Sequence, residues 1–457
     1  MSAAFSRDPQ PVTLLETNYR RIQTDIPAPG TREILERLDQ VESRSMHGQL
    51  PLVWDRAENF SIFDPAGNRF IDFTSTIFVA NVGHSNPRVI KAVRDVLDRP
   101  LQSCYAYGNE LRARYLERLV GFAGAPFEKA FLLSAGTEAT EAALKLMRMY
   151  GQQQDKHRRG IVCIEGNWHG RTLGAQMLSS NRPQRDWIGY EDPHIHHIPF
   201  PYPQVLDGRS GEAFLEESLR SLEATGVDIP LDVSGFMLET FQGWGAVFYP
   251  KDYVQAIERF CRRHDILLAF DEMQSGFGRT GRAFGYQHYG VTPDLLCCGK
   301  GMGGGMPLSG VLGRAEVMDL PAIGDMSSTH SANPLVCAAG LAVLDEIEER
   351  DLIVDTARKG EVLLEALADL ADRFPARVDR IHGHGLVAAI LFRDPNSGQP
   401  DSSFPSRVAE RCMQKGVLVV HTGRESIKLG PPLTITVEAL LEGVSVIADS
   451  IDEVDTA

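Results

Sequence analysis

Two short apolar runs in this chain each lead into a charged side chain. Ile266–Phe270 runs directly into Asp271, and Leu295–Cys298 is followed by Gly299 and Lys300. Short apolar runs of this kind are typical of strands buried on both faces, as in a parallel sheet covered by helices. Ligands of such sheets bind at the carboxyl ends of the strands. The sequence therefore predicts a carboxylate and an amine at one edge of a parallel sheet.

The same alternation of elements extends over most of the chain. From about residue 80, apolar strands are separated by helical stretches, which predicts an α/β fold with a mostly parallel central sheet. The expected strands are Ala130–Ser134, Ile161–Glu165, Gly235–Glu239, Ile266–Phe270, Leu295–Cys298 and Gly310–Leu312, and the expected helices are Glu138–Tyr150, Tyr253–His264 and Leu335–Arg350.

The two ends of the chain have different patterns. An expected helix at Thr31–Val41 precedes two short apolar segments around Asp64-Pro65-Ala66-Gly67-Asn68, which indicates a hairpin. After residue 341 the order is helix, strand, helix, the strand Val417–Val420 and a last helix from Val437. We therefore expect an N-terminal segment (residues 1–75) packed on a small C-terminal α+β domain (residues 341–457), with a large domain at residues 76–340 between them.

Composition excludes several classes of protein. The formal net charge of −15 disfavours nucleic acid and anionic membrane surfaces as partners. The seven cysteines form no C-x-x-C pair, which favours buried thiols in a reducing compartment. The first ten residues lack the pattern of a signal peptide, and no apolar stretch approaches the roughly 18 residues that a spanning helix needs. We expect a cytoplasmic enzyme, with no metal site.

A carboxylate and an amine at neighbouring strand ends suit a flat, charged cofactor with a carbonyl group, and pyridoxal phosphate fits this description. Lys300 would form the Schiff base, and Asp271 would keep the pyridine nitrogen protonated. The alternative for Lys300 is a surface lysine in a glycine-rich turn, because glycine mainly reports unusual backbone geometry.

Two further segments supply groups that such a cofactor needs. Gly136 and Thr137 follow a predicted strand and begin a predicted helix, where free N–H groups bind phosphate. Trp168 and Arg171 follow the next predicted strand, where an aromatic ring can stack on a cofactor and a guanidinium can bind a carboxylate. Taken singly, each also fits a helix cap, a core aromatic residue or a solvated arginine.

Together these segments resemble the class III (subgroup II) pyridoxal-phosphate aminotransferases of fold type I, over roughly residues 50–440. The resemblance implies that His169 and Gln274 join the cofactor site, that Gln274 lies near the phenolic oxygen, and that Thr329 reaches the phosphate of a neighbouring subunit in a homodimer. The motifs that carry it are Asp72-Phe73-Thr74-Ser75, Ala135-Gly136-Thr137-Glu138-Ala139, Trp168-His169-Gly170-Arg171-Thr172, Glu239-Thr240-Phe241-Gln242-Gly243, Asp271-Glu272-Met273-Gln274, Gly299-Lys300, Thr329-His330-Ser331-Ala332-Asn333-Pro334 and Pro431-Pro432-Leu433-Thr434-Ile435.

Departures from the family pattern concern the substrate. Where glutamate-using members commonly carry an arginine before the Pro-Pro-Leu motif, a residue that can pair with the counterpart of Glu239, this chain has Lys428. A lysine offers a point charge in place of a bidentate fork. The counterpart of Arg171 binds the distal carboxylate of the substrate in the ornithine and 4-aminobutyrate branch, and Ile77 belongs to the segment that orients the substrate.

The resemblance implies an aminotransferase that moves an amino group from an amine or ω-amino acid to pyruvate or 2-oxoglutarate in two half-reactions. Racemisation, epimerisation or decarboxylating transamination on the same scaffold remains an alternative, because all of these reactions need Lys300 and Asp271. A non-catalytic relative would be expected to have lost one of these two residues.

Overall fold

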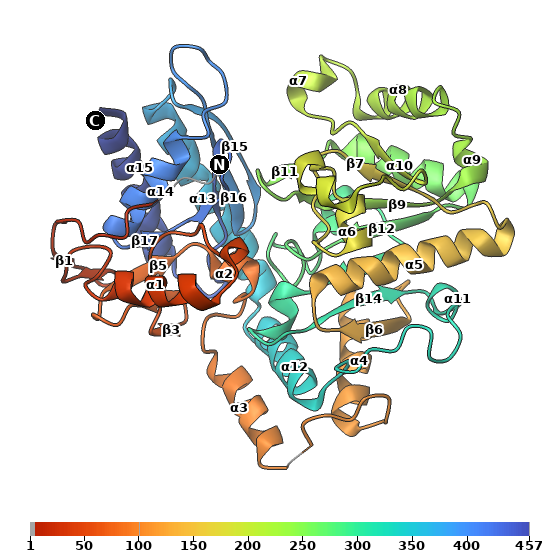
Figure 1. Cartoon of the computed structure of the whole chain (residues 1–457), viewed down its shortest axis with the longest axis horizontal. Coiled ribbons are helices and arrows are strands. Elements are labelled where there is room, and N and C mark those ends of the chain that lie inside the picture. Colours follow the sequence, from red (N-terminus) through yellow and green to blue (C-terminus); the bar gives the residue numbers. More distant parts are fainter. Residues whose placement is uncertain (1–4, 100, 457) are drawn as a thin grey trace.

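A seven-stranded sheet forms the centre of the larger part of the chain (Figure 1). The computed structural model describes residues 5–99 and 101–456. The strand order is β6-β14-β13-β12-β9-β7-β8, and all neighbouring pairs are parallel except the two that include β14. The strands are β6 (Lys129–Leu133), β7 (Gly160–Ile164), β8 (Ile195–Ile198), β9 (Val233–Glu239), β12 (Leu267–Asp271), β13 (Leu295–Cys298) and β14 (Ser309–Gly313).

Both faces of this sheet are buried, which explains why its strands lack alternation of polar and apolar residues. In β12, Leu267 and Ala269 join a core cluster with helix α5 (Gly136–Gln154), whereas Leu268 and Phe270 join the larger core with helix α10 (Lys251–His264). Successive side chains of a strand point to opposite faces, so a strand covered on both sides must be apolar throughout. Further helices of this part are α3 (Pro87–Leu97), α4 (Glu110–Ala123), α6 (Leu173–Leu178), α8 (Gly211–Glu223) and α12 (Pro334–Glu349).

The C-terminal part contains a four-stranded antiparallel sheet in the order β15-β16-β19-β18. Its strands are β15 (Val378–His384), β16 (Val387–Phe392), β18 (Val420–His421) and β19 (Ser426–Leu429), and its helices are α13 (Leu352–Arg373), α14 (Phe404–Gln414) and α15 (Val437–Thr456).

The N-terminal residues lie against this C-terminal part, as the red and blue segments of Figure 1 show. Strand β17 (Val417–Leu418) pairs in parallel with β5 (Arg69–Asp72), with Val417 opposite Ile71. The other members of that sheet are β1 (Leu15–Glu16), β2 (Arg21–Ile22), β3 (Arg56–Glu58) and β4 (Ser61–Phe63), and helix α1 (Thr31–Val41) precedes β3.

The mixed α/β class predicted from the sequence is confirmed, but the C-terminal part differs in detail: two strands, β15 and β16, lie where one was expected, and β19 was not expected. The expected single strand Val417–Val420 consists of β17 and β18, which belong to different sheets. The chain passes from one sheet to the other at Val419, because Leu418 pairs with Asp72 whereas Val420 pairs with Lys428. A run of four apolar residues gives no sign of such a change.

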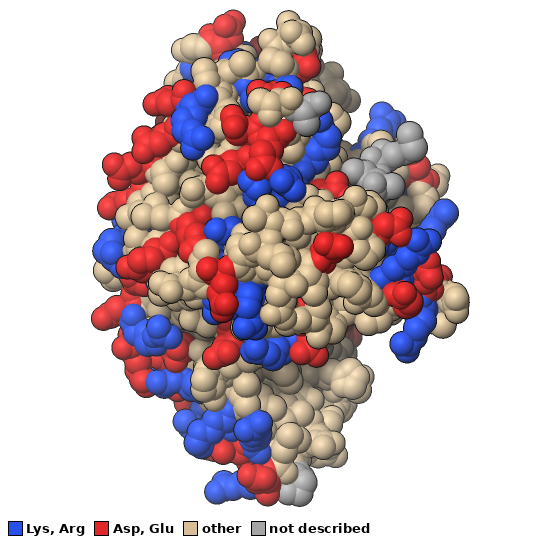
Figure 2. Space-filling model, turned by 90° about the vertical axis from the view of Figure 1, so that its left-hand side faces the viewer, with Lys and Arg blue, Asp and Glu red and all other residues tan. Residues whose placement is uncertain are grey.

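The surface carries both signs of charge in small groups. Figure 2 shows acidic and basic side chains interspersed on one face of the molecule. Ion pairs such as Arg88–Glu349 and Arg118–Glu348 account for part of this pattern. None of the described helices is both long and apolar enough to cross a membrane.

Candidate active site

Three neighbouring strands end in the residues that the sequence singled out. Strand β9 ends at Glu239, β12 ends at Asp271, and β13 ends at Cys298, two residues before Lys300. Asp271 lies opposite Glu239 in one parallel pair and opposite Cys297 in the other. Register therefore places two carboxylates and one amine at the same edge of the sheet.

Asp271 is held by two donors and is only 5% exposed. Its Oδ1 accepts a hydrogen bond from the Met273 N–H at 3.0 Å, and its Oδ2 lies 2.9 Å from Nδ1 of His169. Because a carboxylate can only accept, Nδ1 of His169 carries the proton. In the described part of the chain the buried Nε2 of His169 has no hydrogen-bond partner. His169 follows β7 and Asp271 ends β12, so the pair spans the end of β9, which lies between these two strands in the sheet.

Glu239 is a second buried carboxyl group beside Asp271. Its Oε2 accepts hydrogen bonds from the N–H groups of Trp168 at 2.9 Å and Gly243 at 3.3 Å. Burial, together with the nearby Asp271, raises the pKa of Glu239 to about 7, against the opposing effect of His169 and these N–H donors. The carboxyl group is therefore poised to change its charge near neutral pH.

Lys300 projects into the same region from a strained backbone. Its φ angle of +46° lies in the left-handed region, which residues other than glycine rarely adopt. Such strained residues cluster at functional sites. Burial lowers the pKa of the Lys300 amine, while Asp271 and Glu239 act in the opposite direction. A lowered pKa makes the neutral, nucleophilic form of an amine more accessible.

The N-terminus of α5 lies at the same edge of the sheet. The N–H groups of Gly136 and Thr137 form no hydrogen bond with any described residue, as expected in the first turn of a helix. A Cβ atom at Gly136 would lie 2.8 Å from Sδ of Met273, and one at Gly299 would lie 2.5 Å from the same atom. Met273 therefore packs directly against both glycines, a contact that the sequence did not predict, and a side chain at either position would displace it.

Trp168 and Arg171 lie near one another at the exposed margin of this region. The guanidinium carbon of Arg171 lies 4.6 Å from the centre of the Trp168 ring. The Arg171 side chain is exposed and forms no ion pair with any described carboxylate. Its planar group is thus oriented by the indole ring and available to a ligand.

Lys428 reaches the site from β19 of the C-terminal sheet. Its Nζ donates to the carbonyl oxygen of Gly243 at 2.5 Å and to Oε1 of Gln274 at 2.7 Å. It also lies 4.6 Å from the ring centre of Phe78. Burial lowers the pKa of Lys428 to about 7, Glu239 acts in the opposite direction, and Lys300 and Arg279 lower it further.

Two of the predicted residues, Ile77 and Thr329, lie away from the edge of the central sheet, from the start of α5 and from β19. Ile77, which is 39% exposed, belongs to the short left-handed turn α2 (Ser75–Phe78), where all four residues have positive φ angles. Thr329 is exposed in the stretch between α11 (Ala315–Met318) and α12. The remaining predicted residues lie at the edge of the central sheet, at the start of α5 or on β19.

The residues of this group fit pyridoxal phosphate. A buried amine, a carboxylate oriented by His169 and a helix N-terminus with free N–H groups match the aldehyde, the pyridine nitrogen and the phosphate of that cofactor. The glycine at position 136 keeps the approach to the helix N-terminus free of a side chain.

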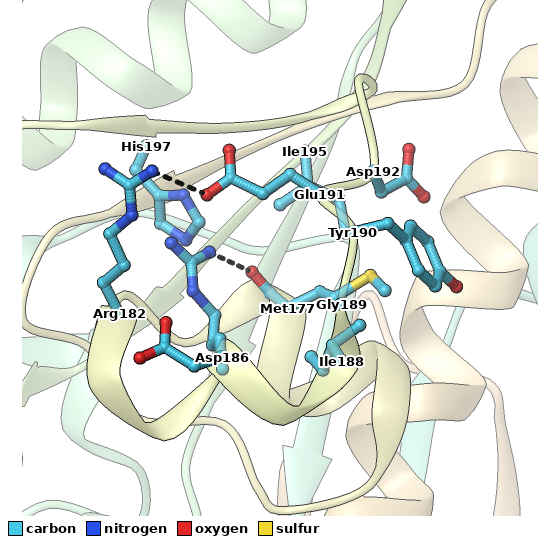
Figure 3. A pocket seen from close by; sticks show the side chains of 11 residues that line it. Met177, Arg182, Asp186, Ile188, Gly189, Tyr190, Glu191, Asp192, Ile195 and His197 are labelled. Carbon is cyan, nitrogen blue, oxygen red and sulfur yellow. Dashed lines mark hydrogen bonds and ion pairs between the residues drawn. The ribbon is translucent and has the colours of Figure 1, made fainter.

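Sequence reasoning missed the contribution of neutral acceptors and packing contacts. The Gly243 carbonyl binds Lys428, and the ring of Phe78 fills the space beside Gly430, where a Cβ atom would lie 1.6 Å from Cε1 of Phe78. The nearest signal in the sequence is the glycine directly before Pro431-Pro432. A separate surface pocket of about 360 Å³ lies around Arg185, Tyr190 and His197, and none of the predicted site residues lines it (Figure 3).

Comparison with known proteins identifies the family. The family model for aminotransferase class-III matches residues 43–451. The probable 4-aminobutyrate aminotransferase of Bacillus subtilis (strain 168) is 33% identical over 430 residues, which cover 91% of this chain and 97% of that protein. The leucine/methionine racemase of Thermococcus litoralis is 32% identical over 435 residues, which cover 93% and 96%.

A solved structure agrees with these relatives. The ornithine aminotransferase from Toxoplasma gondii ME49 superimposes with a TM-score of 0.82 at 27% identity, covering 93% of this chain and 96% of that one. The chain therefore belongs to the class III aminotransferases, and it is a pyridoxal-phosphate-dependent transaminase of fold type I that moves an amino group from an amine or amino acid to a keto acid.

Proposed function

We propose that the cofactor-binding roles follow the geometry at the edge of the central sheet. The bound cofactor supplies an aldehyde and an electron-accepting ring. Lys300 is the amine that attaches it and then moves the substrate's proton, and Asp271, oriented by His169, holds the ring nitrogen. Gly136 and Thr137 bind the phosphate, Trp168 covers the ring, and Gln274 lies near the phenolic oxygen.

The substrate is an ω-amino acid, with 2-oxoglutarate as the preferred acceptor. Arg171 binds the carboxylate that is distant from the reacting carbon, and Ile77 forms a wall of the entrance. Lys428 keeps one of its three N–H donors for a carboxylate close to the reacting carbon, because the other two bind protein acceptors. Glu239 lies beside the place of this carboxylate, and its own ionisation near pH 7 changes the net charge of that part of the site.

The observation that carries this substrate class is the exposed guanidinium of Arg171, oriented by Trp168 and without a carboxylate partner among the described residues. The Bacillus relative is named for 4-aminobutyrate, a molecule with an amine at one end and a carboxylate at the other. A bidentate contact between guanidinium and carboxylate would distinguish such a substrate from a simple amine.

Replacement of Arg171 tests the proposal. We expect Arg171→Gln to raise KM for 4-aminobutyrate and for 2-oxoglutarate by about 10- to 100-fold, because one charge-assisted hydrogen-bonded pair is lost. The reaction of butylamine with pyruvate, in which neither molecule has a distal carboxylate, should change less than about threefold on the same argument. Steady-state kinetics at several fixed acceptor concentrations give KM for the donor and for the acceptor. A mechanism of two half-reactions gives parallel lines in the double-reciprocal plots.

The matched control is Arg182→Gln, since Arg182 is also an exposed arginine in the region after β7. It should leave both substrate pairs unchanged. Equal losses for both pairs in Arg171→Gln, or no loss for either, would remove Arg171 from the carboxylate subsite. Change of configuration of an amino acid without any keto acid would favour the racemase alternative.

We further propose a cytoplasmic homodimer. The exposed position of Thr329 supports its assignment to the phosphate of the neighbouring subunit, since it lies outside the buried group of its own chain. All seven cysteines are free, as is usual in a reducing compartment.

A further inference from the structure

We propose that Lys428 is a positioning residue, which fixes the amide of Gln274 so that its NH2 group faces the phenolic oxygen of the cofactor. The inference rests on the proposed roles of Lys300 and Gln274, and it adds a function for Lys428 that is separate from substrate binding. It follows from the two hydrogen bonds of Lys428, its burial and the chemistry of the amide.

Strand β19 directs Lys428 away from the core of its own sheet. Ile427 and Leu429 are fully buried in that core, and the alternation of the strand turns Lys428 toward the central sheet. Lys428 itself is only 4% exposed. Its Nζ therefore links the C-terminal sheet to two turns of the large part of the chain, one that follows β10 (Phe241–Gln242) and one that follows β12.

The partners of this ammonium group are unusual for a buried charge. Gly243 and Gln274 offer neutral oxygen atoms, and within residues 5–99 and 101–456 no carboxylate lies in ion-pair distance of Lys428. The charged and titratable groups that influence it are Glu239, Lys300 and Arg279. Burial without a carboxylate partner destabilises the charged form, in line with the lowered pKa of Lys428, so the two neutral oxygen atoms are the contacts that hold its Nζ in place.

The orientation of the Gln274 amide follows from the chemistry of its partner. An ammonium group has three donors and no acceptor, so it can bind only Oε1 of the amide. Nε2 then becomes the group presented to the site, and it donates to no described residue. A Cβ atom at Gly243 would lie 2.6 Å from Nε2 of Gln274 and 2.8 Å from Oε1 of Glu239, so glycine leaves room for both side chains.

A donor at the phenolic oxygen stabilises the negative charge of that oxygen. It therefore lowers the pH at which the bound cofactor loses its proton. Without Lys428 the amide of Gln274 can rotate and present its oxygen, and this stabilisation is lost. The effect of Lys428 on the cofactor should accordingly require Gln274.

The test is a double-mutant cycle read by absorbance. The holoenzymes of the wild type, Lys428→Met, Gln274→Leu and the double variant are titrated with acid and base, and the visible absorbance of the bound cofactor gives one apparent pKa for each. We expect Lys428→Met to raise this value by about one pH unit, the size of one hydrogen bond. In the Gln274→Leu background the same replacement should shift the apparent pKa by less than about 0.3 unit, because the amide through which Lys428 acts is absent.

An equal shift in both backgrounds would overturn the inference, because it would show that Lys428 acts directly through its charge. No shift in either background would also overturn it. The matched control is Lys359→Met, since Lys359 is a buried lysine of α13 that donates to the Leu433 carbonyl at 3.0 Å. This control should leave the titration unchanged, which separates the effect from a general loss of stability.

Failure of the wider functional proposal gives a different result. A wild-type protein with added pyridoxal phosphate but without a visible band would contradict the role of Lys300. A normal visible band, with an apparent pKa of the bound cofactor that does not depend on Lys428, would contradict only the present inference.

Discussion

At the scale of single residues, Gly243 joins two buried ionisable side chains. Its N–H donates to Glu239, and its carbonyl oxygen accepts from Lys428. Burial raises the pKa of Glu239 and lowers that of Lys428, each to about 7. Both groups therefore change their protonation close to neutral pH, where an aminotransferase exchanges substrates of different charge.

The raised pKa of Glu239 predicts a specific dependence of stability on pH. The folded protein holds a proton on Glu239 between pH 4.5 and about 7, whereas the unfolded chain does not. The contribution of this group is therefore present at pH 4.5 and is lost as the pH rises to about 7 and above. Glu239→Gln keeps the acceptor for Trp168 and Gly243 but removes the titration.

We expect the free energy of unfolding of Glu239→Gln, relative to wild type, to rise by up to about 3 kcal/mol between pH 4.5 and 8. Urea unfolding of both proteins without cofactor at several pH values measures the difference. A difference that stays constant over this range would contradict the raised pKa of Glu239.

At the scale of elements, the end of β19 and the turn α2 are fitted to one another. The ring of Phe78 occupies the space next to Gly430, and Ser75 donates to the Gly430 carbonyl at 2.7 Å. The turn is further held by Asp72, which accepts from Thr74 and Ser75 and lies 2.6 Å from Nε2 of His84. These contacts maintain four consecutive left-handed residues beside the proposed substrate entrance.

Gly430→Ala should therefore destabilise the protein by about 2–3 kcal/mol, because the added methyl group overlaps a ring that is 1% exposed. Chemical denaturation gives the value. The matched control is Gly121→Ala on the exposed side of α4, where a Cβ meets no atom within 4 Å. This control should stabilise by up to about 1 kcal/mol through helix propensity, and equal effects of the two changes would contradict the packing argument.

Continuous apolar runs made six of the seven central strands predictable, whereas short strands such as β8 and β19 were missed. Strand β8 contains His196 and His197 between two isoleucines, and β19 alternates serine and lysine with isoleucine and leucine over only four residues. Strand β8 pairs with β7, about 30 residues earlier, and β19 pairs with β16 as well as with the two-residue strand β18, so such short runs carry little local signal. The acceptors of Lys428 were unpredictable for a related reason, since a backbone carbonyl has no signature in the sequence.

At the scale of the whole molecule, the proposed homodimer predicts that a change at Thr329 weakens cofactor binding but leaves the dimer intact. Thr329→Ala should weaken binding of pyridoxal phosphate about tenfold, because one hydroxyl contact to the phosphate is lost. Its mass in solution should stay at twice the 50.4 kDa of one chain. Equilibrium titration and light scattering measure the two properties.

Ser327→Ala is the control for this prediction, because Ser327 is an exposed hydroxyl residue two positions earlier. It should change neither property. A monomeric wild-type protein, or unchanged affinity in Thr329→Ala, would contradict a site shared between subunits.

The parallel pairing of β17 with β5 has a consequence for the order in which the protein matures on the ribosome. All seven strands of the central sheet lie within residues 129–313, so this sheet has its full complement well before translation ends. Strand β5 must wait for residues 417–418, which are made almost 350 residues later. Until then the N-terminal segment emerges with one edge of β5 unpaired at Ile71 and Asp72, and an open strand edge is a site of mispairing with other chains.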